Sequence, residues 1–301
     1  MTKLTLKALT YLLVIMTAFS CANYKLETRI ENEADDVLAG ESFLRYSTKR
    51  FEIIQSKKNA IQSAVTYCHQ NEFKKGLSIL RKNLKKEQEN PNYWNHLGTC
   101  FYLNNQFAKA KYYFLISLQK GKRKGHKVSE FLPAYNNLGL VFMKLRSYDN
   151  ALSNFKLADL RGKLLTPKFN MLQLYLKFGQ LQKAYELANH LYRKSPKDVD
   201  VISSLGTIHI LRGEFDVANK YFKKLDPKYL EREDISGHYA IVLYKLGNLE
   251  GAKKMLQNGQ YTRIKPIKNM RDNLSNIIER ELKVLKELEY DKAKKTVDKR
   301  S

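Results

Sequence analysis

The feature that most limits the fold of this chain is a sequence repeat with a period of about 34 residues, the length typical of tandem helical hairpins. It fills most of the 301 residues. Six segments begin at Lys57, Pro91, Leu132, Leu165, Val199 and Glu233, and an insert lengthens the second of them. Such a fixed period is typical of stacked units that bury their apolar faces only against their neighbours. We therefore predict one continuous core.

Small residues recur in register within the segments. Eleven of the twelve residues at the eighth and twentieth places are Gly or Ala, the eighth being Ala64, Gly98, Gly139, Leu172, Gly206 and Ala240 and the twentieth Gly76, Ala110, Ala151, Ala184, Ala218 and Ala252. This spacing predicts two antiparallel helices, A and B, that approach closely at these places. The fifteenth place, in the turn between A and B, is Gly or Asn except at Arg146, which predicts a positive φ there.

The second segment resembles a tetratricopeptide repeat almost fully, through Trp94, Leu97, Gly98, Phe101, Ala110 and Phe114. The resemblance implies an all-α fold, a right-handed superhelix (α-solenoid) of about six tetratricopeptide repeats with the A helices on the concave side. The repeats span 57–90, 91–131 with a basic insert, 132–164, 165–198, 199–232 and 233–266. Apolar residues at helical spacing predict a charged capping helix and tail over 267–301.

The first residues indicate export. Lys3 and Lys7 precede an apolar stretch that is too short to span a membrane, so 1–20 is interpreted as a signal peptide. The stretch ends in Ala18-Phe19-Ser20-Cys21, which resembles a bacterial lipobox, so we expect Cys21 to carry diacylglycerol and palmitate. Ordinary secretion and an uncleaved anchor are the alternatives. In bacterial lipoproteins the residue after the lipidated Cys directs sorting, and by that rule Ala22 implies the outer membrane, facing the periplasm. Residues 21–56 are then the lipidated Cys and an acidic tether.

The formal charge of +24 suggests nucleic acid as a partner, because Lys and Arg neutralise phosphates. Export makes that partner implausible. The basic residues gather on the first B helix and in the insert, at Lys74, Lys75, Arg81, Lys82, Lys85 and Lys86 and at Lys120, Lys122, Arg123, Lys124 and Lys127. They form either a solvated outer face or a contact with lipid headgroups or an acidic partner.

No pattern predicts catalysis. The six His residues do not cluster, and no metal motif or phosphate-binding loop occurs, so we expect a non-enzyme with no cofactor, no metal and no small-molecule substrate. Cys68 and Cys100 lie on neighbouring A helices. An oxidising periplasm permits a disulfide between them, but helix spacing usually exceeds the limit of about 7 Å between bridged Cα atoms, so we predict two buried thiols.

The groove of the A helices is the expected protein-binding surface. The family places five positions of each A helix there, which here include Asn92, Asn95, Thr99, Tyr102, Asn136, Leu140, Met143, Phe169, Gln173, Thr207, Ile210, Ile241 and Tyr244. This lining suits an extended strand or a helix of a partner protein.

A narrower resemblance concerns the order of the parts. Six repeats behind a lipobox, with the insert before Tyr135 to Val141 and the stretch Arg212 to Phe222, resemble the pilotin lipoproteins of type IV pili. The resemblance implies a partner such as a secretin and a role in secretin localisation and assembly. The alternatives are a general periplasmic adaptor that recruits cell-wall enzymes or proteases, and an enzyme or metal protein.

Overall fold

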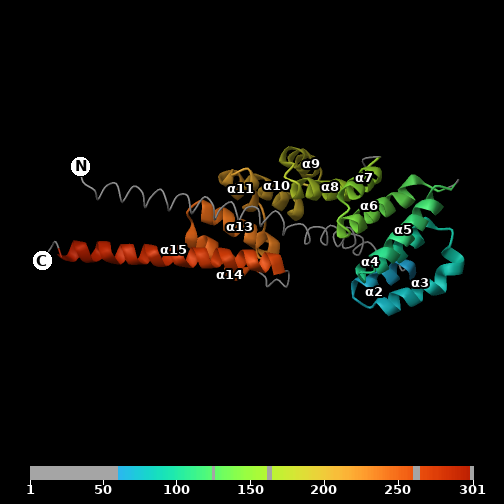
Figure 1. Ribbon diagram of the computed structural model, residues 1–301, viewed down its shortest axis with the longest axis horizontal. Coiled ribbons are helices and arrows are strands. Elements are labelled where there is room, and N and C mark those ends of the chain that lie inside the picture. The colour runs from blue at the N-terminus through green and yellow to red at the C-terminus, as the bar shows by residue number, and fades with distance from the viewer. Residues whose placement is uncertain (1–59, 124–125, 161–164, 260–264, 299–301) are drawn as a thin grey trace. The chain divides into compact units, whose positions relative to one another are not determined.

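A computed structural model describes residues 60–123, 126–160, 165–259 and 265–298. The predicted anchor at Cys21 and the tether lie outside these residues. The described residues form helices and turns without a strand, and successive helices pair as antiparallel hairpins (Figure 1). This confirms the prediction of an all-α solenoid of tetratricopeptide type. The chain divides into two compact units, and the boundary between them in the sequence lies between Phe178 and Gly179.

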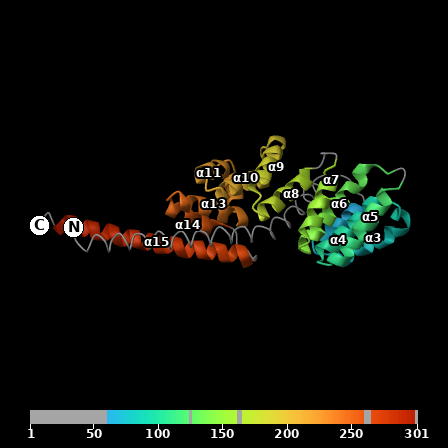
Figure 2. The same cartoon turned by 45° about the horizontal axis from the view of Figure 1, so that its top comes forward.

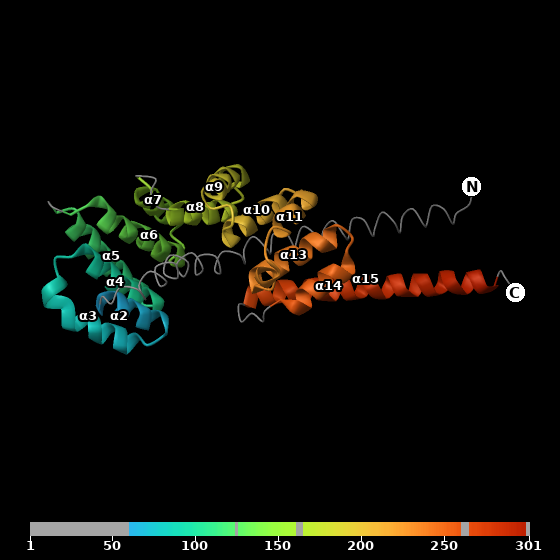
Figure 3. The same ribbon diagram turned by 180° about the vertical axis from the view of Figure 1, so that it is seen from behind.

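The N-terminal unit (residues 60–178) contains three helical hairpins and the A helix of a fourth. The A helices are α2 (Ala60–His69), α4 (Pro91–Leu103), α6 (Val128–Lys144) and α8 (Leu165–Lys177), and the B helices are α3 (Phe73–Glu87), α5 (Phe107–Gly121) and α7 (Tyr148–Ala158). The first three A helices each pack on the B helix that follows, and α2 and α4 also pack on the next A helix (Figure 3).

The C-terminal unit (residues 179–298) begins with a B helix. It comprises α9 (Leu181–Lys194), the pair α10 (Val199–Leu211) and α11 (Phe215–Phe222), the short α12 (Pro227–Leu230), the pair α13 (Glu233–Lys245) and α14 (Leu249–Asn258), and the long α15 (Lys265–Asp298). Figure 2 shows α15 running beside α14 and continuing past it. Its buried Ile267, Met270, Leu274 and Ile278 join the core cluster that includes residues of α13 and α14.

Three glycines at the eighth place face an aromatic ring. A Cβ atom on Gly98, Gly139 or Gly206 would stand 2.5–2.7 Å from the ring of Phe114, Phe155 or Phe222, which is the twenty-fourth residue of the same segment. At these three places the ring therefore fills the space beside the glycine. The small residues in the sequence had instead suggested that the backbone of the B helix lies there. At Gly76 of the first segment, backbone does lie close, because a Cβ atom would stand 2.6 Å from the Ala64 carbonyl oxygen.

The turns between A and B confirm the predicted positive φ at all six fifteenth places. The angles are 63° at Asn71, 56° at Asn105, 57° at Arg146, 62° at Gly179, 74° at Gly213 and 78° at Gly247. Arg146 thus adopts the left-handed conformation in spite of its side chain, which costs free energy that Gly would not incur.

The prediction of two buried thiols is wrong. Cys68 of α2 and Cys100 of α4 form a disulfide, and their Cα atoms are 5.3 Å apart. General helix spacing misled the prediction, because Cys68 and Cys100 face each other where α2 and α4 pack, and facing Cα atoms of packed helices lie within bridging distance. Beside the bridge, the carbonyl oxygen of Ala64 lies 3.9 Å from the Cys100 sulfur.

The insert is shorter than the sequence spacing suggested. The helix α5 continues to Gly121 and α6 begins at Val128, four residues before the expected Leu132, so most of the extra residues lengthen helices. Lys120 belongs to α5. Pro133 lies inside α6, where it has no N–H to donate, so α6 lacks one of its backbone hydrogen bonds.

Candidate functional site

The sequence-predicted groove residues lie on the A helices of both units. In the N-terminal unit these are Asn92, Asn95, Thr99 and Tyr102 on α4, Asn136, Leu140 and Met143 on α6, and Phe169 and Gln173 on α8. In the C-terminal unit they are Thr207 and Ile210 on α10 and Ile241 and Tyr244 on α13. All are buried except Asn92 and Tyr244, which are half-buried. Whether any of them contacts a partner stays a prediction.

Buried polar side chains are concentrated on these helices. Of the 15 buried polar residues among those that the structure describes, Ser117 lies on a B helix and the other 14 lie on A helices. Burial of a polar side chain costs free energy unless it is hydrogen-bonded. The B helices bury mainly apolar residues, such as Leu80, Phe155 and Phe222. The two faces of each repeat therefore differ in chemistry.

A chain of side-chain amides crosses three repeats of the N-terminal unit. The Asn137 amide donates to Asn95 Oδ1 at 3.0 Å, the Asn136 amide donates to Asn137 Oδ1 at 3.3 Å, and the Asn170 amide donates to Asn136 Oδ1 at 2.7 Å. We call these four residues the amide ladder. It joins α4, α6 and α8 and fixes their register on the A side.

Half of the amide ladder was predictable. Asn95 and Asn136 are among the sequence-predicted groove residues, whereas Asn137 and Asn170 were missed. A signal was present, because Asn137 and Asn170 both occupy the sixth place of their segments.

The corresponding face of the C-terminal unit carries a charged cluster. The Arg232 guanidinium donates to both carboxylate oxygens of Asp234, at 2.9 and 2.7 Å, and to Asp200 Oδ1 at 2.7 Å. Burial alone would raise the pKa of Asp234, but hydrogen bonds and charge from Arg232 lower it below its ordinary value. Nearby, His238 Nδ1 lies 3.3 Å from the Thr207 hydroxyl oxygen, and burial lowers the pKa of His238 against the charge of Asp234.

This charged cluster was missed at the level of sequence. A signal was present, because Asp200 and Asp234 occupy the same place in successive segments. Arg232 precedes its helix, so it falls outside the positions at which the repeat pattern predicts contacts. The ion pairs connect α10 and α13 and make this face rigid.

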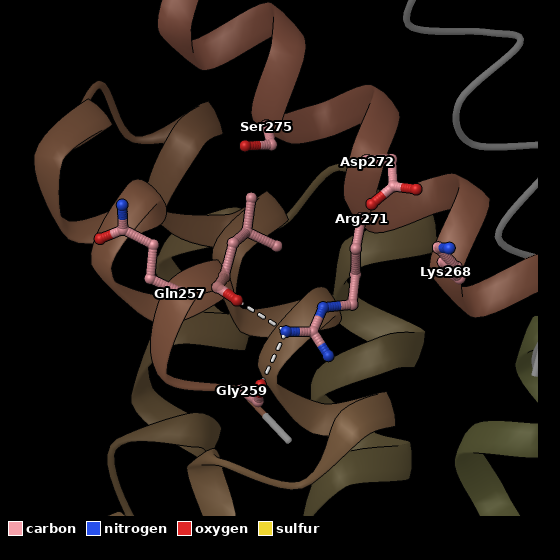
Figure 4. A pocket seen from close by; sticks show the side chains of 7 residues that line it. Gln257, Gly259, Lys268, Arg271, Asp272 and Ser275 are labelled. Carbon is pink, nitrogen blue, oxygen red and sulfur yellow. Dashed lines mark hydrogen bonds between the residues drawn. The ribbon is translucent and has the colours of Figure 1, made fainter. Parts of the chain in front are cut away.

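A cavity of about 380 Å³ lies in the C-terminal unit, where α15 passes α14 (Figure 4). Its lining includes Gln257 of α14 and Lys268, Asp272 and Ser275 of α15. The guanidinium of Arg271 donates to the carbonyl oxygens of Leu256 and Gly259, at 2.6 and 3.0 Å. These carbonyls belong to the end of α14, which leaves its last carbonyls without helical partners. Arg271 therefore attaches α15 to α14.

Neither a metal site nor a spanning helix is found in the described part of the chain. No group of three His, Cys, Asp or Glu side chains there could hold a metal ion. No helix there is both long and apolar enough to cross a bilayer.

Comparison with known proteins supports the fold. No family model matches the chain. A curated BBS4 homolog of the BBSome complex from Drosophila melanogaster is 22% identical over 148 residues, 48% of this chain, and the chain spans only 30% of that protein. The solved structure of the APC/C hetero-tetramer Cut9–Hcn1 is similar with a TM-score of 0.61 and 17% identity, over 85% of this chain and 48% of that chain.

A bacterial structure is also similar. It is that of PilW, described as a widely conserved type IV pilus biogenesis factor, with a TM-score of 0.56 and 19% identity, over 68% of this chain and 94% of that chain. At these identities the similarity is one of fold. Together with the repeat geometry, it defines the fold of the chain as a tetratricopeptide-repeat solenoid.

Proposed function

We propose that this chain is a non-enzymatic scaffold whose A-helix face binds an extended segment of a partner protein. The observation that supports the proposal is the polar character of the A-helix side, where buried amides and hydroxyls hold the A helices in register and Asn92 and Tyr244 stay half-buried. Amide and hydroxyl side chains offer the same donors and acceptors as a peptide backbone. Neighbouring helices are about 8–10 Å apart, so an extended segment at about 3.3 Å per residue would pass one repeat every three residues or so.

The test removes amides while keeping the branched shape of the side chains. The variant Asn95→Leu/Asn136→Leu removes two members of the amide ladder from the A-helix face. We expect that, after cross-linking in the native cell envelope, this variant no longer captures the partner protein. Ser117→Ala is the control, because Ser117 is a buried polar residue of a B helix and donates to the Pro91 carbonyl oxygen, at 2.7 Å. Capture that survives in the double variant, with the fold verified by circular dichroism, would contradict the proposal.

The proposed location is the periplasmic side of the bacterial outer membrane, with Cys21 as the lipid anchor. The signal-like first residues support export, and so does the Cys68–Cys100 disulfide, since such bonds persist in oxidising compartments. We expect Cys21→Ser to release the protein into the soluble periplasmic fraction. A variant that stays in the membrane fraction after a salt wash would argue against lipidation.

The proposed specific role is that of a pilotin-like factor for a type IV pilus secretin. It is supported by the order of the sequence features and by the fold shared with PilW. Deletion should abolish secretin multimers and twitching motility in the host. Unchanged multimers would favour the second candidate, an adaptor for cell-wall enzymes or proteases, and captures should then contain such enzymes.

A further inference from the structure

We propose that the outer face of α3 and α5 in the N-terminal unit binds the anionic headgroups of a phospholipid membrane. We call this surface the basic face, and its exposed cations are Lys74, Arg81, Lys82, Lys85 and Lys86 of α3. It lies on the B helices, so this contact would leave the A-helix face available to a partner protein. The proposal is independent of the lipid anchor and can be tested without it.

The excess of positive charge is concentrated in this unit. Residues 60–178 contain 20 Lys and Arg against 6 Asp and Glu, whereas residues 179–301 contain 25 against 17. The N-terminal unit therefore supplies +14 of the total charge of +24. A single-sign surface of this kind attracts anionic membranes over a range set by the screening length, which is about 8–10 Å at ordinary ionic strength.

The helix α3 carries a row of cations that have no ion pair among the described residues. Lys74, Arg81, Lys82, Lys85 and Lys86 are all exposed. Lys82 and Lys86, like Arg81 and Lys85, are four residues apart, so that like charges repel each other on one side of the helix. Self-repulsion of this kind lowers the stability of the isolated helix, and an anionic surface would relieve it.

Three other basic residues of the unit are already engaged. Lys75 pairs with Glu72 at 3.2 Å and lies 3.9 Å from the centre of the Tyr67 ring. Lys120 of α5 and Arg123 of the insert both pair with Glu89. Lys122 and Lys127 of the insert are exposed without an ion pair to a described residue, but α3 carries more such cations than any other described element of the unit, whereas the sequence pattern favoured α3 and the insert equally.

Exposed apolar side chains also occur on these two helices. Tyr112 and Leu115 of α5 are 61% and 46% exposed, and Leu84 of α3 is 41% exposed. Aromatic and aliphatic side chains beside lysines are typical of surfaces that rest in the headgroup layer of a membrane. They would add an apolar term to the electrostatic attraction.

The composition favours a lipid surface over an acidic protein. Four of the five exposed cations in the row on α3 are Lys. Lys is depleted in protein–protein interfaces, where Arg is enriched, and lysine clusters are typical of contacts with anionic lipids. A purely solvated face is the alternative against which the experiment is designed.

The experiment measures sedimentation of the purified mature chain carrying Cys21→Ser with lipid vesicles. We expect binding to phosphatidylcholine vesicles that contain about one-third phosphatidylglycerol, none to pure phosphatidylcholine, and release at high salt. The variant Arg81→Ala/Lys82→Ala/Lys85→Ala should bind roughly 100-fold more weakly, at about fivefold for each charge removed.

A matched control separates the location of the charge from its amount. The variant Lys220→Ala/Lys223→Ala/Lys254→Ala removes three exposed lysines from the C-terminal unit. Its net charge is therefore the same as that of the triple variant of α3. We expect it to bind as the parent does. Equal weakening of both variants would overturn the proposal, and so would absence of binding to the anionic vesicles or binding to an acidic polypeptide alone. Because all six side chains are exposed, both variants should fold, which thermal unfolding would verify.

Discussion

Arg146 shows how one residue can oppose the turn that it occupies. It holds a φ of 57° at a place where three of the other five turns use Gly. We expect Arg146→Gly to raise the free energy of unfolding by about 1 kcal/mol, because Gly adopts this conformation without steric cost. Chemical denaturation measures the effect. The reverse change, Gly213→Arg, should lower the free energy of unfolding by a similar amount. If Arg146→Gly is less stable than the parent, the Arg146 side chain makes a contact that outweighs the strain of its backbone.

Two histidines make the stability of the chain depend on pH. Burial lowers the pKa of His69 from 6.5 to about 4 and also lowers the pKa of His238. Between pH 6.5 and 4 the unfolded chain binds protons that folded His69 does not, so the free energy of unfolding falls as the pH is lowered. The slope reaches about 1.4 kcal/mol per pH unit for each histidine.

This slope can be assigned with a single variant. We expect His69→Gln to reduce it in denaturation curves recorded at pH 7, 6 and 5, since the variant has no group that titrates at this place. An unchanged slope in His69→Gln would contradict the assignment.

At the scale of elements, α15 has two parts with different roles. Leu274 is fully buried against the C-terminal unit, whereas Leu288 on the same helix is 51% exposed. Leu274→Ala should therefore cost about 2–5 kcal/mol, from lost burial and the cavity that remains. Leu288→Ala should change the stability by less than about 0.5 kcal/mol. Similar losses in the two variants, measured by urea denaturation, would show that the end of the helix packs on something in solution.

The disulfide joins two elements that are otherwise held by packing. In the chain-entropy model, closing a loop of 32 residues stabilises the fold by about 4 kcal/mol. We expect Cys68→Ser/Cys100→Ser to unfold at a lower denaturant concentration than the parent, both in a Cys21→Ser background. Dithiothreitol should shift the parent to the same midpoint and leave the variant unchanged. Detection of two free thiols in the non-reduced parent would refute the bond.

At the scale of the whole molecule, the repeat register carried most of the predictable information. Gly98, Gly139 and Gly206 each contact a ring of their own segment. Because the same contact recurs in each of these segments, the sequence period was enough to predict a small residue at these places. The positive φ of the turns was predictable for the same reason. Local spacing determines such features, and the all-α solenoid follows from their repetition.

What the sequence did not reveal depends on distances between helices. The Cys68–Cys100 bond exists because the two residues face each other where α2 and α4 pack, which no spacing in the sequence shows. Arg232 meets Asp200 of the preceding segment, and its place before α13 lies outside the repeat pattern. The candidate binding residues were placed on the correct helices, but their burial depends on how the helices pack, and their contact with a partner stays a prediction.

The disulfide has a further consequence for a chain held by its N-terminal end. Tension applied ahead of Ala60 would enter the fold through α2, and the covalent bond would pass it directly to α4. The stretch between the two cysteines, which includes α3, would be bypassed and could not be drawn out. The first repeat would then act as a mechanical clamp, and the basic face on α3 would keep its shape while the molecule is under load.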